Sequence, residues 1–353
     1  MQNPHTFILE IIDSLGNKRA KEVIGLRFGL FDGQPRTLQE IGDKYGITRE
    51  RVRQIQESGL ENLFEQGIDA KLKPFEEEIS EHLRDHGELR HEERLLDDLV
   101  CFCLPAKEVA RLSQDKSELN RCRAALNLIL ILGKPFDKYA EDNYFYPFWT
   151  VSQDSIKRAK KTIDSAVKHF KQNKTVLKDE ELFSIIKKAL PGLSDKAIHS
   201  YIEVSKLIGQ NHFGDFGLTH WPEISPRGVR DKAYLIFKKE NRPLHFAEVT
   251  NLINQLMSPE KPAYLQTVHN ELIKDPRFVL IGRGIYALRQ WGYTPGTVAD
   301  VIKRILKEKG PMSKEEILKN VMAQRLIKEN SVLINLQNKK CFKKLEDGRF
   351  ALV

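Results

Sequence analysis

A chain of 353 residues is too long for one all-helical core, so its length predicts two to four domains. The formal net charge of +8 is uneven, at about −1 for residues 1–66, about −5 for residues 67–150 and about +14 for residues 151–353. The start lacks the features of a signal peptide, and no stretch reaches the roughly 18 apolar residues of a membrane span. The basic C-terminal portion is the usual electrostatic footprint of nucleic-acid binding, so we expect a cytoplasmic, nucleoid-associated protein without membrane contact and with no small-molecule substrate evident.

The first 66 residues begin with two expected helices. The first, at residues 5–15, should cover a core, since four apolar side chains fall on one side of it: Phe7, Ile8, Ile11 and Ile12. Residues 18–30 form the second helix. The D-G-Q-P-R stretch at residues 32–36 then predicts a turn.

Residues 37–63 have the pattern of two helices separated by a tight turn. Thr37 and Glu40 form an S/T-x-x-E capping box, which marks the start of the first of these helices. Gly46 accepts a positive φ and so ends that helix, and Thr48 caps the next one. The pattern predicts a helix-turn-helix, a motif whose second helix enters the DNA major groove.

The second helix of this motif has two different faces. At about 100° per residue, the face that should pack on the preceding helices comprises Val52, Ile55, Gly59 and Leu63. The opposite face comprises Arg49, Glu50, Arg53, Gln54 and Glu57. Arginine donates two hydrogen bonds to guanine, glutamine pairs with adenine, and glutamate accepts from cytosine. A charged helical face is often merely solvated, but the capped turn and the mixed side chains favour a reading helix.

Three segments of this region carry a family resemblance: LRFGL at 26–30, PRTLQEIG at 35–42 and ITRERVRQI at 47–55. Residues 19–66 resemble region 4 of the bacterial sigma-70 transcription factors, the domain that reads the promoter −35 element. The resemblance implies that the base-reading side chains are Arg49, Glu50, Arg53 and Gln54. It also implies phosphate contacts from Arg19, Arg27, Thr37, Leu38, Thr48 and Arg51.

The chain departs from the family at the end of this region. Family members usually continue with a basic tail, whereas this chain has Glu57, Ser58, Glu61 and Glu65. The region 4 fold also binds the flap of the polymerase β subunit in its family. The resemblance therefore implies RNA polymerase as a second possible partner besides DNA.

A period of about 70 residues follows the helix-turn-helix. Trp149, Trp221 and Trp291 are spaced by 72 and 70 residues, and each spacing holds three helical stretches and an aromatic hairpin strand. Phe216, Tyr286 and Phe350 occupy one aromatic position of this repeat, and Tyr144 fits it loosely. The tryptophans should be core or hairpin anchors. The pattern predicts four units after residues 1–66, at residues 67–150, 151–225, 226–292 and 293–353.

Three helices followed by a β-hairpin is the order of a winged helix. We therefore expect a mainly α protein with small β-hairpin wings, in which an N-terminal helix-turn-helix precedes tandem winged-helix-like units. RPLHFAEVTNLI at 242–253 and FVLIGRGIYALRQW at 278–291 are echoed by GPMSKEEILKNV and LEDGRFALV near the end of the chain. These segments resemble the HARE-HTH family, which includes the N-terminal domain of the RNA polymerase delta subunit.

The sequence offers little for catalysis or for a cofactor. It contains no P-loop, no G-x-S-x-G, no H-E-x-x-H and no glycine-rich dinucleotide turn, so we expect a protein that is not an enzyme. Four cysteines without paired C-x-x-C spacing disfavour disulfides and a zinc ribbon. A metal site built from His82 and His86 with Cys101 or Cys103 is a minor alternative, and we expect no metal.

Three functions fit these patterns. The first is a transcription-associated protein that reads a −35-like duplex site through its helix-turn-helix, with the basic units adding contacts to DNA or polymerase. The second is an RNA polymerase-binding adaptor with little DNA binding of its own, which the acidic residues after Gln54 favour. The third is a DNA-targeting module of a restriction or defence system.

Overall fold

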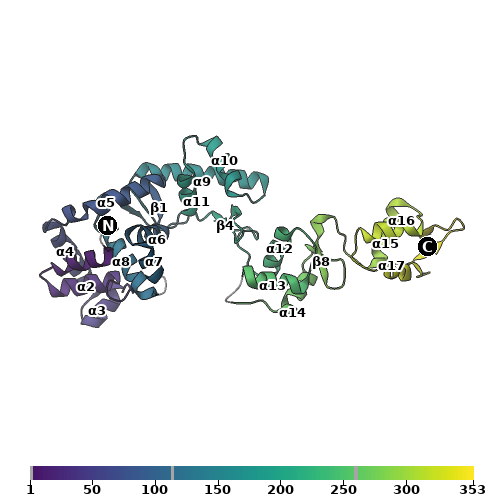
Figure 1. Cartoon of the computed structure of the whole chain (residues 1–353), viewed down its shortest axis with the longest axis horizontal. Coiled ribbons are helices and arrows are strands. Elements are labelled where there is room, and N and C mark those ends of the chain that lie inside the picture. The colour runs from purple at the N-terminus through teal and green to yellow at the C-terminus, as the bar shows by residue number, and fades with distance from the viewer. Residues whose placement is uncertain (1–2, 113–114, 258–260) are drawn as a thin grey trace. The chain divides into compact units, whose positions relative to one another are not determined.

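The computed structural model describes residues 3–112, 115–257 and 261–353. Its described residues form seventeen α-helices and a few short antiparallel sheets (Figure 1). This confirms the mainly α fold class with small β-hairpins. The chain divides into two compact bodies. The N-terminal body holds the residues up to Gly209 together with Phe216–Thr219, and the C-terminal body holds Gln210–Asp215 and His220–Val353.

The N-terminal body starts with four helices: α1 (Pro4–Asp13), α2 (Lys18–Phe28), α3 (Leu38–Tyr45) and α4 (Arg49–Glu65). Asn3 and Asn17 cap α1 and α2, since each side-chain oxygen accepts hydrogen bonds from two backbone N–H groups of the first turn. Gly29 ends α2 with φ 76°, a conformation that suits glycine. Local sequence therefore sets the ends of these helices.

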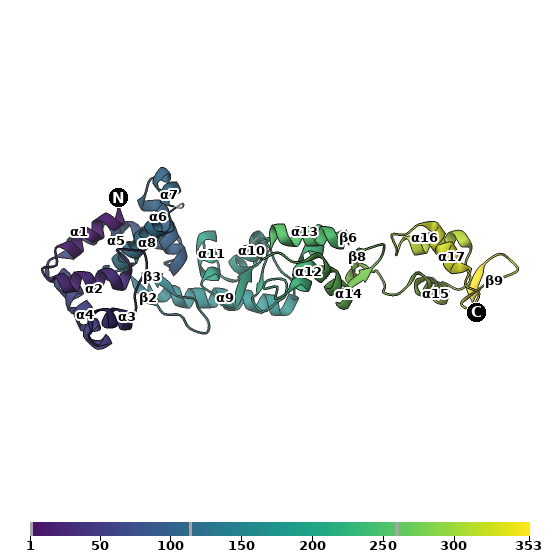
Figure 2. The ribbon, with the colours of Figure 1, turned by 90° about the horizontal axis from the view of Figure 1, so that it is seen from below.

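The core of this region continues past residue 66. Ile8, Ile12 and Ile24 of α1 and α2 are buried in one cluster with Leu126 and Ile129 of a later helix, α8 (Lys116–Leu132). The ribbon shows α1 and α2 beside α8 (Figures 1 and 2). The amphipathic first helix thus covers a core, as predicted, but it shares that core with residues outside the helix-turn-helix.

Four helix–hairpin units follow, and in each of them helices precede a two-stranded hairpin. The first unit comprises α5 (Ile68–Asp85), β1 (Leu89–His91), α6 (Glu92–Cys103), α7 (Ala106–Leu112), α8, β2 (Asp137–Tyr139) and β3 (Phe148–Thr150). The second comprises α9 (Gln153–Asn173), α10 (Asp179–Ala189), α11 (Asp195–Glu203), β4 (Ile208–Gln210) and β5 (Phe216–Leu218). The sheet of the first unit is antiparallel, and its last strand lies in the centre, in the order β1-β3-β2.

The third and fourth units lie in the C-terminal body. The third comprises α12 (Val229–Glu240), β6 (Leu244–His245), α13 (Phe246–Leu256), α14 (Leu265–Lys274), β7 (Phe278–Leu280) and β8 (Ile285–Leu288), followed by a 3₁₀ turn at Arg289–Trp291. The fourth comprises α15 (Val298–Lys309), α16 (Lys314–Met322), α17 (Glu329–Leu336), β9 (Phe342–Lys344) and β10 (Phe350–Leu352). Each has its own apolar core.

The backbone pairing corrects the aromatic position of the first unit. In every unit, the residue two positions before the second main helix pairs with one aromatic residue of the last strand: Arg90 with Trp149, Leu177 with Phe216, Leu244 with Tyr286, and Met312 with Phe350. Trp149 therefore holds the position that Tyr144 was predicted to fill. The reason is the hairpin loop, which has eight residues between β2 and β3 but only four or five in the other units.

The tryptophans are consequently not equivalent to one another. Trp149 lies inside a strand and is almost fully buried, whereas Trp221 and Trp291 follow the last strands of their units and are half-buried. Trp291 packs on the core of the third unit, where its ring lies 6.3 Å from that of Phe237. Trp149 and Trp291 are thus core anchors, as expected. Trp149 lies within the last strand of its unit, whereas Trp291 lies in the turn after the last strand.

Candidate nucleic-acid interface

The turn between α3 and α4 is held by the predicted caps. The Thr37 hydroxyl oxygen accepts from the Glu40 N–H at 3.2 Å, and the Glu40 carboxylate accepts from the Thr37 N–H at 2.7 Å. Gly46 ends α3 with φ 65°. The Thr48 hydroxyl oxygen then accepts from the Arg51 N–H at 3.2 Å and starts α4. These contacts confirm the helix-turn-helix and fix the direction in which α4 leaves the turn.

The apolar face of α4 packs where the periodicity placed it. Val52 is fully buried with Val23 and Ile41 in a small cluster, and Leu63 is buried in the larger core. Gly59 allows a close approach of α4 to α2, because a Cβ there would lie 2.9 Å from the Ile24 side chain. The inward face is therefore fixed by packing, so the opposite face must point to solvent.

A substitution at Gly42 tests how tightly the turn is built. We expect Gly42→Ala to cost about 1–3 kcal/mol of stability, because a Cβ would lie 2.6 Å from the Ile47 carbonyl oxygen, a backbone atom of the turn. Urea unfolding of the full chain should show a lower midpoint at an unchanged m-value. Gly46→Asn is the control, because a Cβ added at Gly46 would meet no atom within 4 Å and asparagine tolerates the positive φ of this position. Equal losses from both substitutions would contradict this account.

The four predicted base-reading side chains are all exposed on α4: Arg49, Glu50, Arg53 and Gln54. They are partly paired with one another and with neighbouring side chains. The Arg53 guanidinium donates to Glu50 at 2.6 Å and also to Glu57. The Arg51 guanidinium donates to the Gln54 amide oxygen at 3.1 Å. The hydrogen bonds from Arg53 hold the pKa of Glu50 below its ordinary value.

Arg53 is therefore held in exposed ion pairs on the outer face of α4. Its partners Glu50 and Glu57 lie three and four residues away on an exposed helix face, where ion pairs contribute little. Breaking these ion pairs thus costs little free energy. The two carboxylates also balance the positive charge of Arg53.

The six side chains implied as phosphate contacts fall into two groups. Thr37 and Leu38 lie at the start of α3 and Thr48 and Arg51 at the start of α4, where backbone N–H groups and the helix dipole favour an anion. The other two, Arg19 and Arg27, are engaged inside the motif. The Arg19 guanidinium carbon lies 3.5 Å from the Tyr45 ring centre, and Arg27 donates to the Arg36 carbonyl oxygen at 2.8 Å.

Tyr45 is a structural residue that the sequence patterns do not identify. Its hydroxyl donates to the Glu22 carboxylate at 2.9 Å, and its ring lies under Arg19. Burial, together with the hydrogen bond to Glu22, raises the pKa of Tyr45 above its ordinary value. The three residues join α2 to the end of α3. The only hint in the sequence is a tyrosine placed immediately before the turn glycine Gly46.

The residues that could hold a metal ion in the first helix–hairpin unit differ from the predicted set of His82 and His86 with a cysteine. His82, His86 and Asp98 offer ligand atoms within 4.8 Å of one another, whereas Cys101 is exposed and burial raises the pKa of the Cys103 thiol to about 12. Asp98 already accepts from His82 at 3.2 Å and from the Arg90 guanidinium at 2.9 Å. The carboxylate is thus satisfied without a cation, and the neighbouring guanidinium disfavours one.

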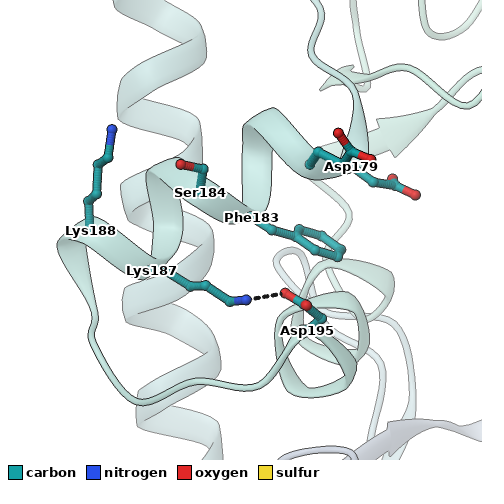
Figure 3. Close-up of a pocket in the computed structure, with 7 residues that line it drawn as sticks. Asp179, Phe183, Ser184, Lys187, Lys188 and Asp195 are labelled. Atoms are coloured by element: carbon teal, nitrogen blue, oxygen red, sulfur yellow. Dashed lines mark ion pairs between the residues drawn. The ribbon is translucent and has the colours of Figure 1, made fainter.

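The second unit contains an open pocket of about 620 Å³ along α10 and the start of α11 (Figure 3). Phe183 forms its apolar wall, and an ion pair of 2.6 Å joins Lys187 to Asp195. Its described lining includes Ser184 but neither a histidine nor a cysteine. Separately, none of the described helices combines the length and the apolar character needed to cross a membrane.

Comparison with known proteins identifies the N-terminal motif. Residues 14–65 match the family model of sigma-70, region 4. The RNA polymerase sigma factor SigA of Bacillus sp is 44% identical over 66 residues. That stretch is 19% of this chain and 17% of the relative, so the likeness concerns one region of each protein. Residues 14–65 therefore form a helix-turn-helix that is similar to region 4 of the sigma-70 factors.

Proposed function

We propose that this protein is a sequence-specific, transcription-associated DNA-binding protein that reads a −35-like duplex site through α4. Arg49, Glu50, Arg53 and Gln54 contact base edges. The single observation that supports this most strongly is the capped, exposed face of α4 within the region that matches sigma-70 region 4. The amino-terminal ends of α3 and α4 supply the phosphate contacts that set the register on the duplex.

The helix–hairpin units add contacts to DNA or polymerase in this proposal. We treat residues 67–150, 151–225, 226–292 and 293–353 as winged-helix-like units, the last two of HARE-HTH type. Their shared order of helices followed by a hairpin, with one residue before the second main helix paired to the last strand, supports the proposal. The net charge of about +14 over residues 151–353 supplies the electrostatic attraction to a polyanion.

An RNA polymerase-binding adaptor is the second candidate. It is favoured by the acidic end of α4, where Glu57, Glu61 and Glu65 are exposed and would repel phosphate. Apolar side chains of α1 and α2 such as Ile8 and Ile24 are buried against α8. These faces are therefore not available to RNA polymerase, which would have to bind the exposed residues of the helix-turn-helix. The two candidates differ in whether the protein binds duplex DNA without polymerase.

Selection from a randomised duplex pool by the full chain tests the proposal. We expect one enriched motif, and we expect no enrichment with the triple variant Arg49→Ala, Arg53→Ala, Gln54→Ala. The full chain is the correct material because the core of the helix-turn-helix extends into α8. Absence of enrichment by the wild-type chain, together with capture of RNA polymerase, would replace the first candidate by the adaptor.

A further inference from the structure

We infer that the sequence-independent contact with nucleic acid that the helix–hairpin units add is made by the fourth unit, through α17 and four lysines in and just before its hairpin. These hairpin lysines are Lys339, Lys340, Lys343 and Lys344. The inference rests on the proposed DNA-binding function and names the surface that serves it. It follows from comparing the last helix before the hairpin, here termed the third helix, across the units: α8, α11, α14 and α17.

In the first unit the third helix is used inside the protein. Seven side chains of α8 are buried, among them Leu126 and Ile129, which pack in the same core as Ile8 and Ile24. Its basic residue Arg123 is paired with Asp97 of α6. This helix supports the helix-turn-helix and does not present a free face to a duplex.

In the second unit the third helix is also occupied. The Ser200 hydroxyl of α11 donates to the Leu89 carbonyl oxygen at 2.6 Å, and the Tyr201 hydroxyl donates to that of Gly87 at 2.8 Å. Glu203, at the end of the same helix, pairs with Arg90. The helix is therefore docked against β1 of the first unit, and its face is unavailable to another partner.

In the third unit the third helix is exposed, but the segment around it carries no net charge. Only Val268 and Leu272 of α14 are buried, whereas Tyr264 and Ile273 are 79% and 61% exposed. From Tyr264 to Leu280, two acidic residues balance two basic ones. An apolar, neutral face of this kind has no electrostatic attraction to phosphate.

The fourth unit combines an exposed third helix with strong positive charge. Only Val332 and Leu336 of α17 are buried. From Lys328 to Lys344 the chain has five lysines and a single acidic residue, Glu329. All four hairpin lysines are exposed, and within the part of the chain that the structure describes none of them has an ion-pair partner. Their charge is therefore available to an external anion.

Lys343 and Lys344 lie on strand β9, and Lys339 and Lys340 lie in the turn directly before it. Phe342 is buried in the core of the fourth unit and anchors β9 directly before Lys343 and Lys344. Strand β9 pairs with β10 through Lys343 opposite Ala351 and Lys344 opposite Phe350. Lysines gathered on one short segment suit the closely spaced charges of a nucleic-acid backbone, and lysine acts there as a point charge without base preference.

The exposed side chains beside the lysines favour duplex DNA over an acidic protein surface. Asn330, Gln337 and Asn338 carry amides that can donate to phosphate and to base edges. An acidic protein partner would more often be matched by an apolar centre with a charged rim. The only large apolar side chain exposed on the described α17 is Ile334, at 67%.

The test is a salt titration of the full chain on a fluorescent duplex of random sequence. The variant replaces the four hairpin lysines by glutamine. We expect its affinity near physiological salt to fall about ten-fold or more, and the slope of log K against log salt to become shallower by about 2 to 4. A second variant with arginine at the four positions should keep the wild-type slope, and thermal melts show that each variant is folded.

A matched control removes four charges from the second unit through Lys161, Lys168, Lys171 and Lys188, all exposed, each replaced by glutamine. We expect this control to keep the wild-type slope. Equal losses from both glutamine variants, or a wild-type slope from the hairpin variant, would overturn the inference. Neither result would touch the proposed function, which fails separately if the wild-type chain enriches no motif from the randomised pool.

Discussion

Arg53→Ala is expected to relax base discrimination at one position of the bound site, by about 1–3 kcal/mol, or roughly 5- to 150-fold. Arg53 lies in the middle of the exposed face of α4, and its guanidinium can donate two hydrogen bonds to one guanine. Its two carboxylate partners are exposed and easily exchanged. The loss should therefore appear as altered preference at one base pair, with the others unchanged.

The measurement is competition binding against all single-base variants of the selected site. Arg51→Ala is the matched control on the same helix, since Arg51 is implied as a phosphate contact. It should weaken every sequence alike and make the salt slope shallower by about 1. If the two substitutions give the same pattern, the assignment of Arg53 to bases and Arg51 to phosphate is wrong.

Arg90→Ala should be among the most destabilising substitutions in the N-terminal body. The Arg90 guanidinium donates to Asp98 at 2.9 Å and also to Glu203, so it joins α6 of the first unit to α11 of the second. Although burial would raise the pKa of Asp98, hydrogen bonds from His82 and Arg90 lower it to about 2. Both carboxylates are charged at neutral pH, and removing Arg90 leaves them partly buried without their partner.

We expect this loss to cost about 2–4 kcal/mol, because breaking one side of a largely buried pair costs more than the pair itself contributes. Urea unfolding of the full chain measures it. Lys157→Ala is the control, since its pair with Asp154 is largely exposed and should contribute less than about 1 kcal/mol. A loss at Arg90 as small as that at Lys157 would show that solvent compensates the two carboxylates.

The sequence repeat predicted the helices and the hairpin of each unit, but not every residue of the aromatic position. The period of about 70 residues predicted units with helices and an aromatic strand, and the positions of Phe216, Tyr286 and Phe350 share one backbone pairing. Tyr144 was wrong because hydrogen bonds, not residue counts, set the register, and the first hairpin has a longer loop. Similarly, His82 and His86 stand together as their spacing implied, but Asp98 from another helix joins them and the cysteines do not.

The sequence by itself determined the helix-turn-helix and which face of α4 is exposed. Capping boxes, a turn glycine and a helical period act between residues at most four positions apart, so they are legible along the chain. Only the tertiary structure decided that α8 shares the core of that motif, that Arg90 joins two units, and which third helices remain exposed. These features depend on contacts between distant residues, and apolar periodicity shows that a face is buried without showing against what.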